Sequence, residues 1–227
     1  MFASGGSKRL LVVCTVVLWS GVVWGEAPWQ RWFAADGLDG FRIVSGSATY
    51  RVEYGVLVGT TAEGSPNTFL VTKDPVRDFE LEFEVKFDAA LNSGVQIRSQ
   101  TAELKPGATE KFGRVNGPQV EIEAGGAKGS VAGYVYGEAT GRGWLTADAK
   151  RVPHQNLKKD DWNQYRIVAR GARIQTWING QPVDDLTDEP IFKTHPKGFI
   201  GLQVHGIKKG TGPFGVAWRN IRIRELK

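Results

Sequence analysis

The chain of 227 residues has one cysteine, Cys14, and only three histidines. Cys14 lies in an N-terminal segment that we expect to be removed, so the mature protein would have no disulfide and no thiol chemistry. Zinc motifs, phosphate-binding loops, dinucleotide fingerprints and nucleophile elbows are also missing from the sequence. An exported domain without disulfides needs a large hydrophobic core, and a chain of this length can supply one.

The first 25 residues have the pattern of a secretory signal peptide. Lys8 and Arg9 form a basic start, residues 10–23 form an apolar run, and Val23-Trp24-Gly25 provides a cleavage point before Glu26. The run is short for a membrane span, although an uncleaved anchor stays open. We therefore expect a signal peptide over 1–25 and a single domain over 26–227, exported to the periplasm or the cell exterior.

Charge points away from two classes of partner. The formal net charge of +5 falls to +3 when Lys8 and Arg9 are removed, and the remaining charges are spread along the chain. A mild, dispersed charge predicts neither a nucleic-acid partner nor a membrane-surface partner.

Strand periodicity dominates the rest of the chain, and helical periodicity is nearly absent. In the stretch 79–87, five apolar residues alternate with four charged ones, which is typical of a half-buried antiparallel strand. Asn179-Gly180 is a favoured two-residue hairpin turn because both of its residues tolerate positive φ. About ten or more short strands, punctuated by glycine and proline, predict an all-β fold, an antiparallel β-sandwich.

A group of polar residues on short strands next to glycines differs from an ordinary solvated face. If their strands share one sheet, these side chains form a concave floor, with aromatic residues of two long insertions (99–118 and 137–161) at its rim. Amides, carboxylates, arginine and stacking rings are suited to binding sugars. The floor residues are Gln96, Arg98, Gln119, Glu121, Glu123, Gln203 and His205, and the rim residues are Trp144 and Tyr136 or Tyr134.

Each of these signals has a structural alternative. Arg98 and Glu121 can form a cross-strand ion pair, and Trp144 can pack as part of a loop. Asn92-Ser93-Gly94 can be a simple turn. His205 can be a hydrogen-bonded residue of the sandwich. His154 and His195 are expected to be exposed loop residues. Calcium is an open cofactor possibility, but acidic clusters are more often solvated turns. The acidic cluster consists of Asp184, Asp185, Asp188 and Glu189.

The ordered series of short motifs along the chain resembles the DUF1080 family, the 3-keto-disaccharide hydrolase domain. The matching segments are 79–84, 92–98, 119–122, 161–163, 178–180, 198–206 and 218–223. The resemblance implies a concanavalin-like jelly-roll fold, export, and cleavage of glycosides that carry a ketone at C3. The chain departs from the family where Gln119-Val-Glu121 exchanges the positions of acid and amide, and where Trp218 replaces a phenylalanine.

The chemistry implied by this resemblance gives the floor residues roles. A base removes the proton at C2, a donor stabilises the enolate, and an acid assists departure of the aglycone. We assign His205 as base, Arg98 with Gln96 or Gln203 as the enolate donors, and Glu121 as acid or orienter of His205; the His and Glu roles could be exchanged. Gln119, Asn92, Tyr136 and Trp144 are expected to bind the carbohydrate substrate.

Two rival functions stay open from the sequence. One is a non-catalytic carbohydrate-binding module, because sandwiches of this kind often only bind. The other is an interaction domain of an exported assembly. The sequence does not decide the sugar, the anomer, hydrolase against lyase outcome, a metal requirement or the oligomeric state.

Overall fold

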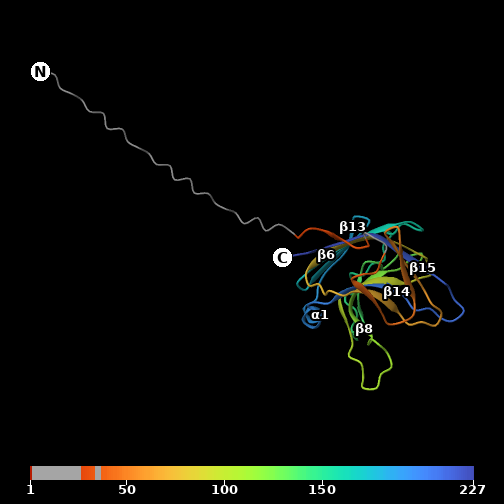
Figure 1. Cartoon of the computed structure of the whole chain (residues 1–227). Helices are drawn as coiled ribbons and strands as arrows, with labels where there is room; N and C mark the ends of the chain where they lie inside the picture. The colour runs from red at the N-terminus through yellow and green to blue at the C-terminus, as the bar shows by residue number, and fades with distance from the viewer. Residues whose placement is uncertain (2–26, 34–36) are drawn as a thin grey trace.

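The computed structural model describes residues 1, 27–33 and 37–227, which fold into two antiparallel β-sheets packed face to face (Figure 1). Sheet A has the strand order β13-β12-β11-β6-β15-β4-β3, and β1 pairs with β15. Sheet B has the order β10-β9-β8-β7-β14-β5-β2. The predicted all-β antiparallel sandwich is thereby confirmed. Apart from Met1, the predicted signal peptide lies outside the described residues.

The strands and the helix of the described residues have the following bounds. They are β1 Gln30–Arg31, β2 Phe41–Val44, β3 Thr49–Glu53, β4 Val56–Thr60, β5 Thr68–Thr72, β6 Phe79–Phe87, β7 Ser93–Thr101, β8 Val115–Ile122, β9 Val135–Glu138, β10 Gly143–Trp144, β11 Asn163–Arg170, β12 Arg173–Ile178, β13 Gln181–Thr187, α1 Glu189–Thr194, β14 Phe199–Val204 and β15 Gly215–Glu225.

The core lies between the sheets, and the alternation in β6 shows how the sequence builds it. Leu81 and Phe83 are fully buried, while Glu82 between them faces outward. The Phe83 ring stacks on Tyr165 of the neighbouring β11 at 5.1 Å between centroids. Trp218, the departure from the family pattern, is also fully buried, so its position serves packing. Burying side chains of this size contributes roughly 2–3 kcal/mol each.

The local turn signals behave as expected. Asn179 and Gly180 have φ values of 51° and 77°, and Ile178 pairs with Gln181 across the turn, which confirms the predicted two-residue hairpin. The short helix α1 begins after Asp188, whose side chain accepts a hydrogen bond from the Ile191 amide at 2.9 Å. Among the described residues, no helix has the length and apolar composition needed to cross a bilayer.

The two long insertions are shorter than the sequence suggests. Strands β7 and β8 extend into the first, leaving residues 102–114 as the loop that projects below β8 in Figure 1. The second contains β10, which pairs with β9.

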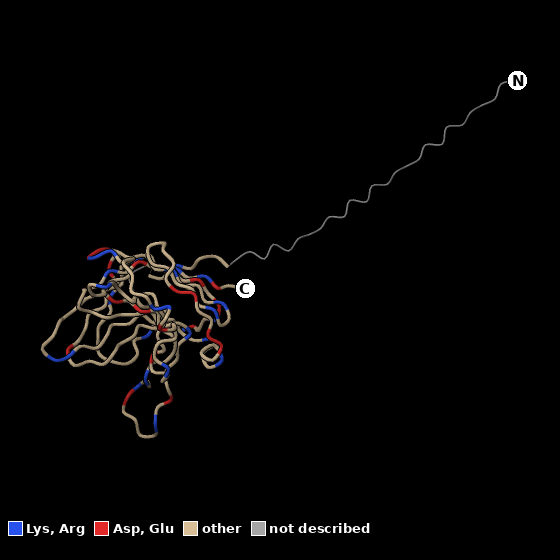
Figure 2. The backbone as a smooth tube through the Cα atoms, turned by 180° about the vertical axis from the view of Figure 1, so that it is seen from behind, with Lys and Arg blue, Asp and Glu red and all other residues tan. Residues whose placement is uncertain are grey.

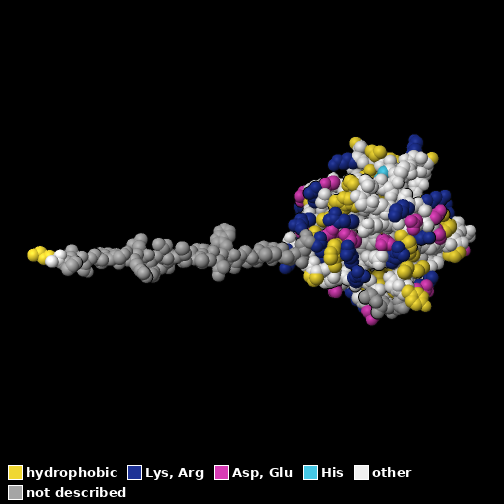
Figure 3. All heavy atoms as spheres, turned by 90° about the horizontal axis from the view of Figure 1, so that it is seen from above, with side chains coloured by type: hydrophobic (Ala, Val, Ile, Leu, Met, Phe, Trp, Pro, Cys, Tyr) yellow, Lys and Arg dark blue, Asp and Glu magenta, His cyan; other side chains and the backbone are white. Residues whose placement is uncertain are grey.

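Acidic and basic residues are interleaved along the chain (Figure 2), and neither sign forms a patch of its own on the face seen in Figure 3.

Candidate functional site

Strands β8, β7 and β14 are neighbours in sheet B, and their polar residues share its outer face. Gln96 lies opposite Gln119 on one side and opposite Gly201 on the other. Glu121 lies opposite Gly94, and the same register places Gln203 on the other side of Gly94. The alternating apolar residues of these strands point into the core. We call Gln96, Gln119, Glu121 and Gln203 the polar floor; their shared face is as predicted, and their chemical roles stay predictions.

Glu121 is the one acidic residue of the polar floor, and it is only 6% exposed. Its carboxylate accepts hydrogen bonds from Gln119 Nε2 at 2.7 Å and from Asn92 Nδ2 at 3.3 Å. Burial, with smaller contributions from the charges of Glu123 and Glu138, raises the pKa of Glu121 to about 7 against the lowering effect of these two amides. A carboxyl group with this pKa can exchange protons near neutral pH.

The amides of the polar floor form a continuous chain of hydrogen bonds. Gln96 Nε2 donates to Gln119 Oε1 at 2.6 Å, and Ser99 Oγ donates to Gln96 Oε1 at 2.6 Å. Both glutamines and Ser99 are buried. Ser99 was not among the predicted site residues, because it stands at the start of the predicted insertion 99–118.

Gln203 contrasts with the other amides of the floor. Its side chain makes no hydrogen bond to the described residues, and its Oε1 is fully buried without a partner. A buried, unsatisfied amide oxygen is costly in a folded protein. Among the described residues, the buried Tyr165 hydroxyl and Trp218 Nε1 also have no partner.

Arg98 does not lie on the polar floor, and the predicted position of this residue has to be corrected. It occupies a β-bulge, where β7 has one residue more than β8 and β14, and its φ is 51°. The guanidinium donates to Arg77 O, to Gly171 O at 2.6 Å and to Asp78 Oδ1 at 3.0 Å, and it packs over the Phe192 ring. The predicted alternative of an Arg98–Glu121 ion pair is also wrong. Arg98 instead ties the end of β7 to the turns of sheet A.

His205 follows β14 directly and is partly buried. Its Nδ1 donates to Gly206 O at 2.7 Å, which leaves Nε2 as the ring nitrogen without a hydrogen bond to the described residues. The next amide, that of Gly206, is held by Asn67 Oδ1 at 2.9 Å. The chain thus orients the imidazole through its own backbone, and no carboxylate hydrogen-bonds it.

Aromatic residues stand beside the floor at the β9 edge of sheet B. Tyr136 lies opposite Gln119 and also opposite Trp144 of β10. The two rings meet edge to face at 5.4 Å between centroids, and Arg151 covers the Trp144 ring at 4.4 Å. Both rings are partly exposed, so they can offer a surface to a ligand as well as to each other.

A groove of about 980 Å³ reaches sheet B at β5 and β8, but the described residues that line it include none of the polar floor. Phe69, which pairs with Gln203, lines it, as do Phe112 and Asn67. Arg114 and Glu138, which form an ion pair at 3.1 Å, lie along its wall. The groove is large enough for more than a single sugar ring.

A second hollow, of about 340 Å³, lies at the end of the sandwich near the glycine-rich turn 124–130. It contains His154, whose Nε2 donates to Ala132 O at 2.8 Å and whose Nδ1 accepts from the Asn156 amide at 3.3 Å. Because both of its ring nitrogens are used by the backbone, His154 has a structural explanation there. The polar floor is the stronger candidate site.

The remaining predicted features have structural roles. His195 is buried rather than exposed, with Nε2 at 2.9 Å from Asn116 Oδ1. The acidic cluster is dispersed: Asp184 binds Thr146, Asp185 pairs with Arg173, and Asp188 caps α1. In the part of the chain that the structure describes, no group of three or more His, Cys, Asp or Glu is placed to hold a metal ion.

A model of the family described as "3-keto-alpha-glucoside-1,2-lyase-like domain" matches residues 28–224. The chain belongs to this family. No curated protein matches the chain. The name of the family refers to a lyase of 3-keto-α-glucosides.

Solved structures share the fold at low sequence identity. A protein proposed to be a glycosyl hydrolase, from Parabacteroides distasonis, is 20% identical, with a TM-score of 0.59 over 88% of this chain and 94% of that one. The carbohydrate-binding module CBM66 from Bacillus subtilis is 16% identical, with a TM-score of 0.55 over 82% and 96%. A glycosyl hydrolase family 16 protein from Mycobacterium smegmatis is 14% identical, with a TM-score of 0.51 over 88% and 100%. The likeness establishes the jelly-roll fold.

Proposed function

We propose that the protein cleaves 3-keto-glycosides at the polar floor, with Glu121 as the base that removes the proton at C2. The observation that carries this proposal is a buried carboxyl group held by Asn92 and Gln119, whose pKa burial raises to about 7. A base with a pKa near the working pH combines adequate strength with a useful fraction in the ionised form. Membership of the family supplies the substrate class.

The reaction needs no oxidant and no covalent intermediate. Glu121 takes the C2 proton, whose acidity comes from the adjacent C3 ketone, and the electron pair moves into an enolate over C2, C3 and the ketone oxygen. When the enolate collapses, the bond between C1 and the glycosidic oxygen breaks and a C1–C2 double bond forms. The departing oxygen takes up a proton, and addition of water across the double bond completes net hydrolysis.

Gln203 replaces Arg98 as the proposed donor for the enolate oxygen. Arg98 is committed to backbone and to Asp78 on the sheet A side of β7, so it is not free to act on the floor. The Gln203 side chain lies on the floor, and its Nε2 group, which makes no hydrogen bond to the described residues, is the proposed donor. A donor placed before the charge develops stabilises it without reorganisation.

His205 is the proposed acid for the departing oxygen. Its Nδ1 is fixed on Gly206 O, so Nε2 is the nitrogen that would give up the proton. The assignment reverses the roles that the resemblance first implied, because the raised pKa belongs to Glu121. The alternative order, with His205 as base, is an outcome of the following test.

The proposal is tested with two substrates. A 3-keto-glucoside with a nitrophenol aglycone measures cleavage, and a 3-keto sugar without a leaving group at C1 measures only exchange of the C2 hydrogen in D₂O. Glu121→Gln should abolish both exchange and cleavage, whereas His205→Ala should lower cleavage and keep exchange. The reverse pattern would make His205 the base, and release no faster than the spontaneous reaction would overturn the enzyme proposal.

The rival proposal is a carbohydrate-binding module, and it is favoured by one observation, the shared fold with CBM66. Glycan binding without turnover, lost on Trp144→Ala, would support it.

Export of the mature chain is part of either proposal and rests on the N-terminal sequence pattern. Mass spectrometry of the N-terminus after secretion in a bacterial host would test it, with Glu26 expected as the first residue.

A further inference from the structure

We propose that Ser99 is a positioning residue for Glu121, acting through two intervening glutamines. Its hydroxyl donates to Gln96 and so favours one direction of the hydrogen-bond chain that runs through Gln96 and Gln119 to the carboxylate. This inference rests on the proposed role of Glu121 as base. Ser99 itself touches no reacting atom.

The direction of the chain follows from the chemistry of its members. An ionised carboxylate can only accept hydrogen bonds, so Gln119 must present its NH₂ group to Glu121. Its carbonyl oxygen then faces Gln96, which must present an NH₂ group in turn, and the Gln96 oxygen is left for Ser99. The Ser99 hydroxyl donates to Gln96 Oε1 at 2.6 Å, closer than its contacts with Ile97 O at 3.2 Å and Pro118 O at 3.4 Å, and this short donation favours the direction in which every link is satisfied.

Without the Ser99 proton, both amides could turn over. Each glutamine would then present its oxygen where it now presents nitrogen, and Gln119 would face the carboxylate with an acceptor. That arrangement is compatible only with a protonated Glu121, which can donate. Ser99 therefore favours the ionised base, in opposition to the effect of burial.

The bulge at Arg98 is what brings Ser99 into the chain. Three positions separate Ser99 from Gln96, and in a regular strand such residues point to opposite faces. The extra residue restores them to one face, where Ser99 lies opposite Phe199 of the outer-face apolar cluster. The bulge requires a left-handed backbone at Arg98, which is strained for a residue with a side chain. The contacts of Arg98 with Arg77 O, Gly171 O and Asp78 hold this conformation in place.

Two glycines leave room for the chain. A Cβ atom at Gly94 would lie 2.7 Å from the Gln119 side chain, and one at Gly117 would lie 2.4 Å from Ser99 Oγ. Each glycine lies on the strand that pairs with the strand of the residue it accommodates: Gly94 on β7 faces Gln119 of β8, and Gly117 on β8 faces Ser99 of β7. The space that the chain occupies is therefore built into the backbone of β7 and β8.

The test measures the Glu121 carboxyl directly. In protein with ¹³C-labelled glutamate, NMR titration gives the pKa of Glu121, with the resonance assigned by its loss in Glu121→Gln. Ser99→Ala should raise this pKa by about one unit, since a hydrogen bond to an ionised group is lost or weakened. Ser93→Ala is the matched control: Ser93 is a buried serine of the same strand, but it donates to Gln203 O outside the chain, so its removal should leave the titration unchanged.

A second variant keeps the test decisive if Ser99→Ala folds poorly. Gln96→Met removes the middle link at similar length and should raise the Glu121 pKa by a similar amount. The double variant should shift the Glu121 pKa no more than Gln96→Met alone, because Ser99 acts on Glu121 only through Gln96. Additive shifts, or no shift in any of the three, would overturn the inference.

The titration also separates this inference from the proposed function. It requires no substrate, so a protein that shows the expected shift without turnover would refute the proposed function and leave the hydrogen-bond chain established. If the protein is active, the acid limb of its pH–rate profile should move with the titrated pKa in Ser99→Ala and stay in place in Ser93→Ala. A uniform fall in rate without that movement would assign Ser99 a purely structural role.

Discussion

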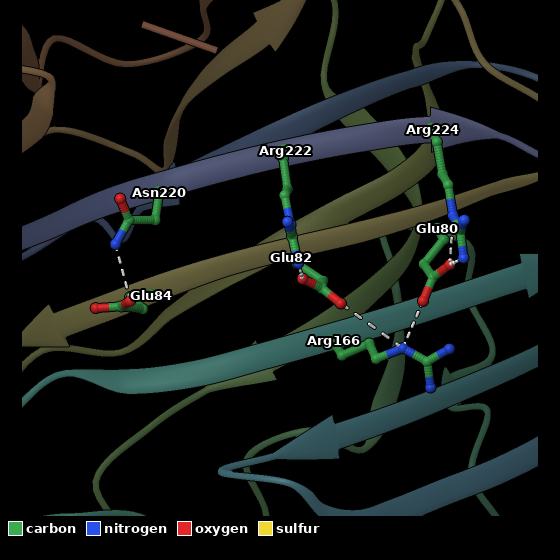
Figure 4. A network of polar contacts seen from close by, with 7 residues as sticks. All are labelled: Glu80, Glu82, Glu84, Arg166, Asn220, Arg222 and Arg224. Carbon is green, nitrogen blue, oxygen red and sulfur yellow. Dashed lines mark hydrogen bonds and ion pairs between the residues drawn. The ribbon is translucent and has the colours of Figure 1, made fainter. Parts of the chain in front are cut away.

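The outer faces of the two sheets use the same alternation for opposite purposes. On sheet A, Glu80 and Glu82 of β6 meet the arginines of β11 and β15 in a ladder of ion pairs (Figure 4). Arg166 reaches both glutamates, at 2.5 and 3.9 Å. On the polar floor of sheet B, neutral amides surround the carboxyl group of Glu121.

The difference appears in the proton affinities of the two kinds of carboxyl group. Burial raises the pKa of Glu80, but hydrogen bonds from Arg224 and Arg166 outweigh it, and the net pKa is lowered. Glu121 has amide donors but no cation, so burial prevails and its pKa rises to about 7. A carboxyl group paired with arginine serves stability, whereas one held only by amides keeps a proton affinity suited to catalysis.

The sharpest test of this comparison is a pair of matched substitutions. Glu121→Gln should lower turnover of a 3-keto-glucoside by a factor on the order of 10²–10⁴, the usual contribution of a general base. Glu82→Gln changes the same residue type on sheet A and should leave turnover within about twofold. Steady-state kinetics at neutral pH measures both, and comparable losses in the two variants would mean that the faces do not differ in function.

The pH dependence of stability should have opposite signs for the two faces. Because the pKa of Glu121 is raised from 4.5 when unfolded to about 7 when folded, the folded state binds more protons between these values, and its contribution to stability grows as the pH falls from 7 to 4.5. Relative to Glu121→Gln, the protein should gain on the order of 3 kcal/mol over this range. Urea unfolding at pH 8 and 4.5 measures the gain.

Glu80 provides the contrasting sign. Its lowered pKa contributes stability that is present above the unfolded pKa and is lost as the pH falls through the folded one, below 4.5. The free energy of unfolding of Glu80→Gln should therefore be lower than that of the unmodified protein above pH 4.5, and this difference should shrink as the pH falls below 4.5. A gain in stability of the unmodified protein on acidification that persists in Glu121→Gln would assign the effect to another group.

Removing a ladder carboxylate should weaken the fold without affecting the site. The Glu80 side chain is 5% exposed and binds two arginines, so Glu80→Ala removes its ion pairs with Arg166 and Arg224 and should cost about 1–3 kcal/mol. Chemical unfolding gives this value, and turnover at a temperature well below the transition should be unchanged. A loss of turnover in the folded variant would show that the two faces are coupled.

The smallest effect is expected at an exposed pair on β3 of sheet A. Arg51 and Glu53 are 54% and 55% exposed and lie 2.7 Å apart. Arg51→Ala should change the free energy of unfolding by less than about 0.5 kcal/mol, because solvent screens such pairs. A larger change in urea unfolding would indicate that the sheet A charges stabilise as one extended network rather than as separate pairs.

The sequence predicted most of the polar floor because period-two alternation is a local property. Gln96, Gln119, Glu121 and Gln203 each lie between apolar residues that must enter the core, so their own strands fix the face they occupy. The order of β8, β7 and β14 then follows from the fold, which brings the three strands together. The exchange of acid and amide in Gln119-Val-Glu121 leaves these two side chains in direct contact, at 2.7 Å.

The bulge at Arg98 could not be predicted from neighbouring residues. An arginine with positive φ is unfavourable by itself, and no residue near it in sequence indicates this conformation. Its support comes from Arg77 O, Asp78 and Gly171, which are distant along the chain. The extra residue of the bulge removes Arg98 from the floor and brings Ser99, which was predicted to begin an insertion, onto it.

The sequence alone determined the all-β architecture, the Asn179-Gly180 hairpin and the family, because alternation, turn residues and ordered motifs are carried by neighbouring residues. Only the tertiary structure decided which polar residues are satisfied and which carboxyl group holds a proton near neutral pH. Those properties depend on desolvation and on partners from other strands, and both arise when the sheets are assembled.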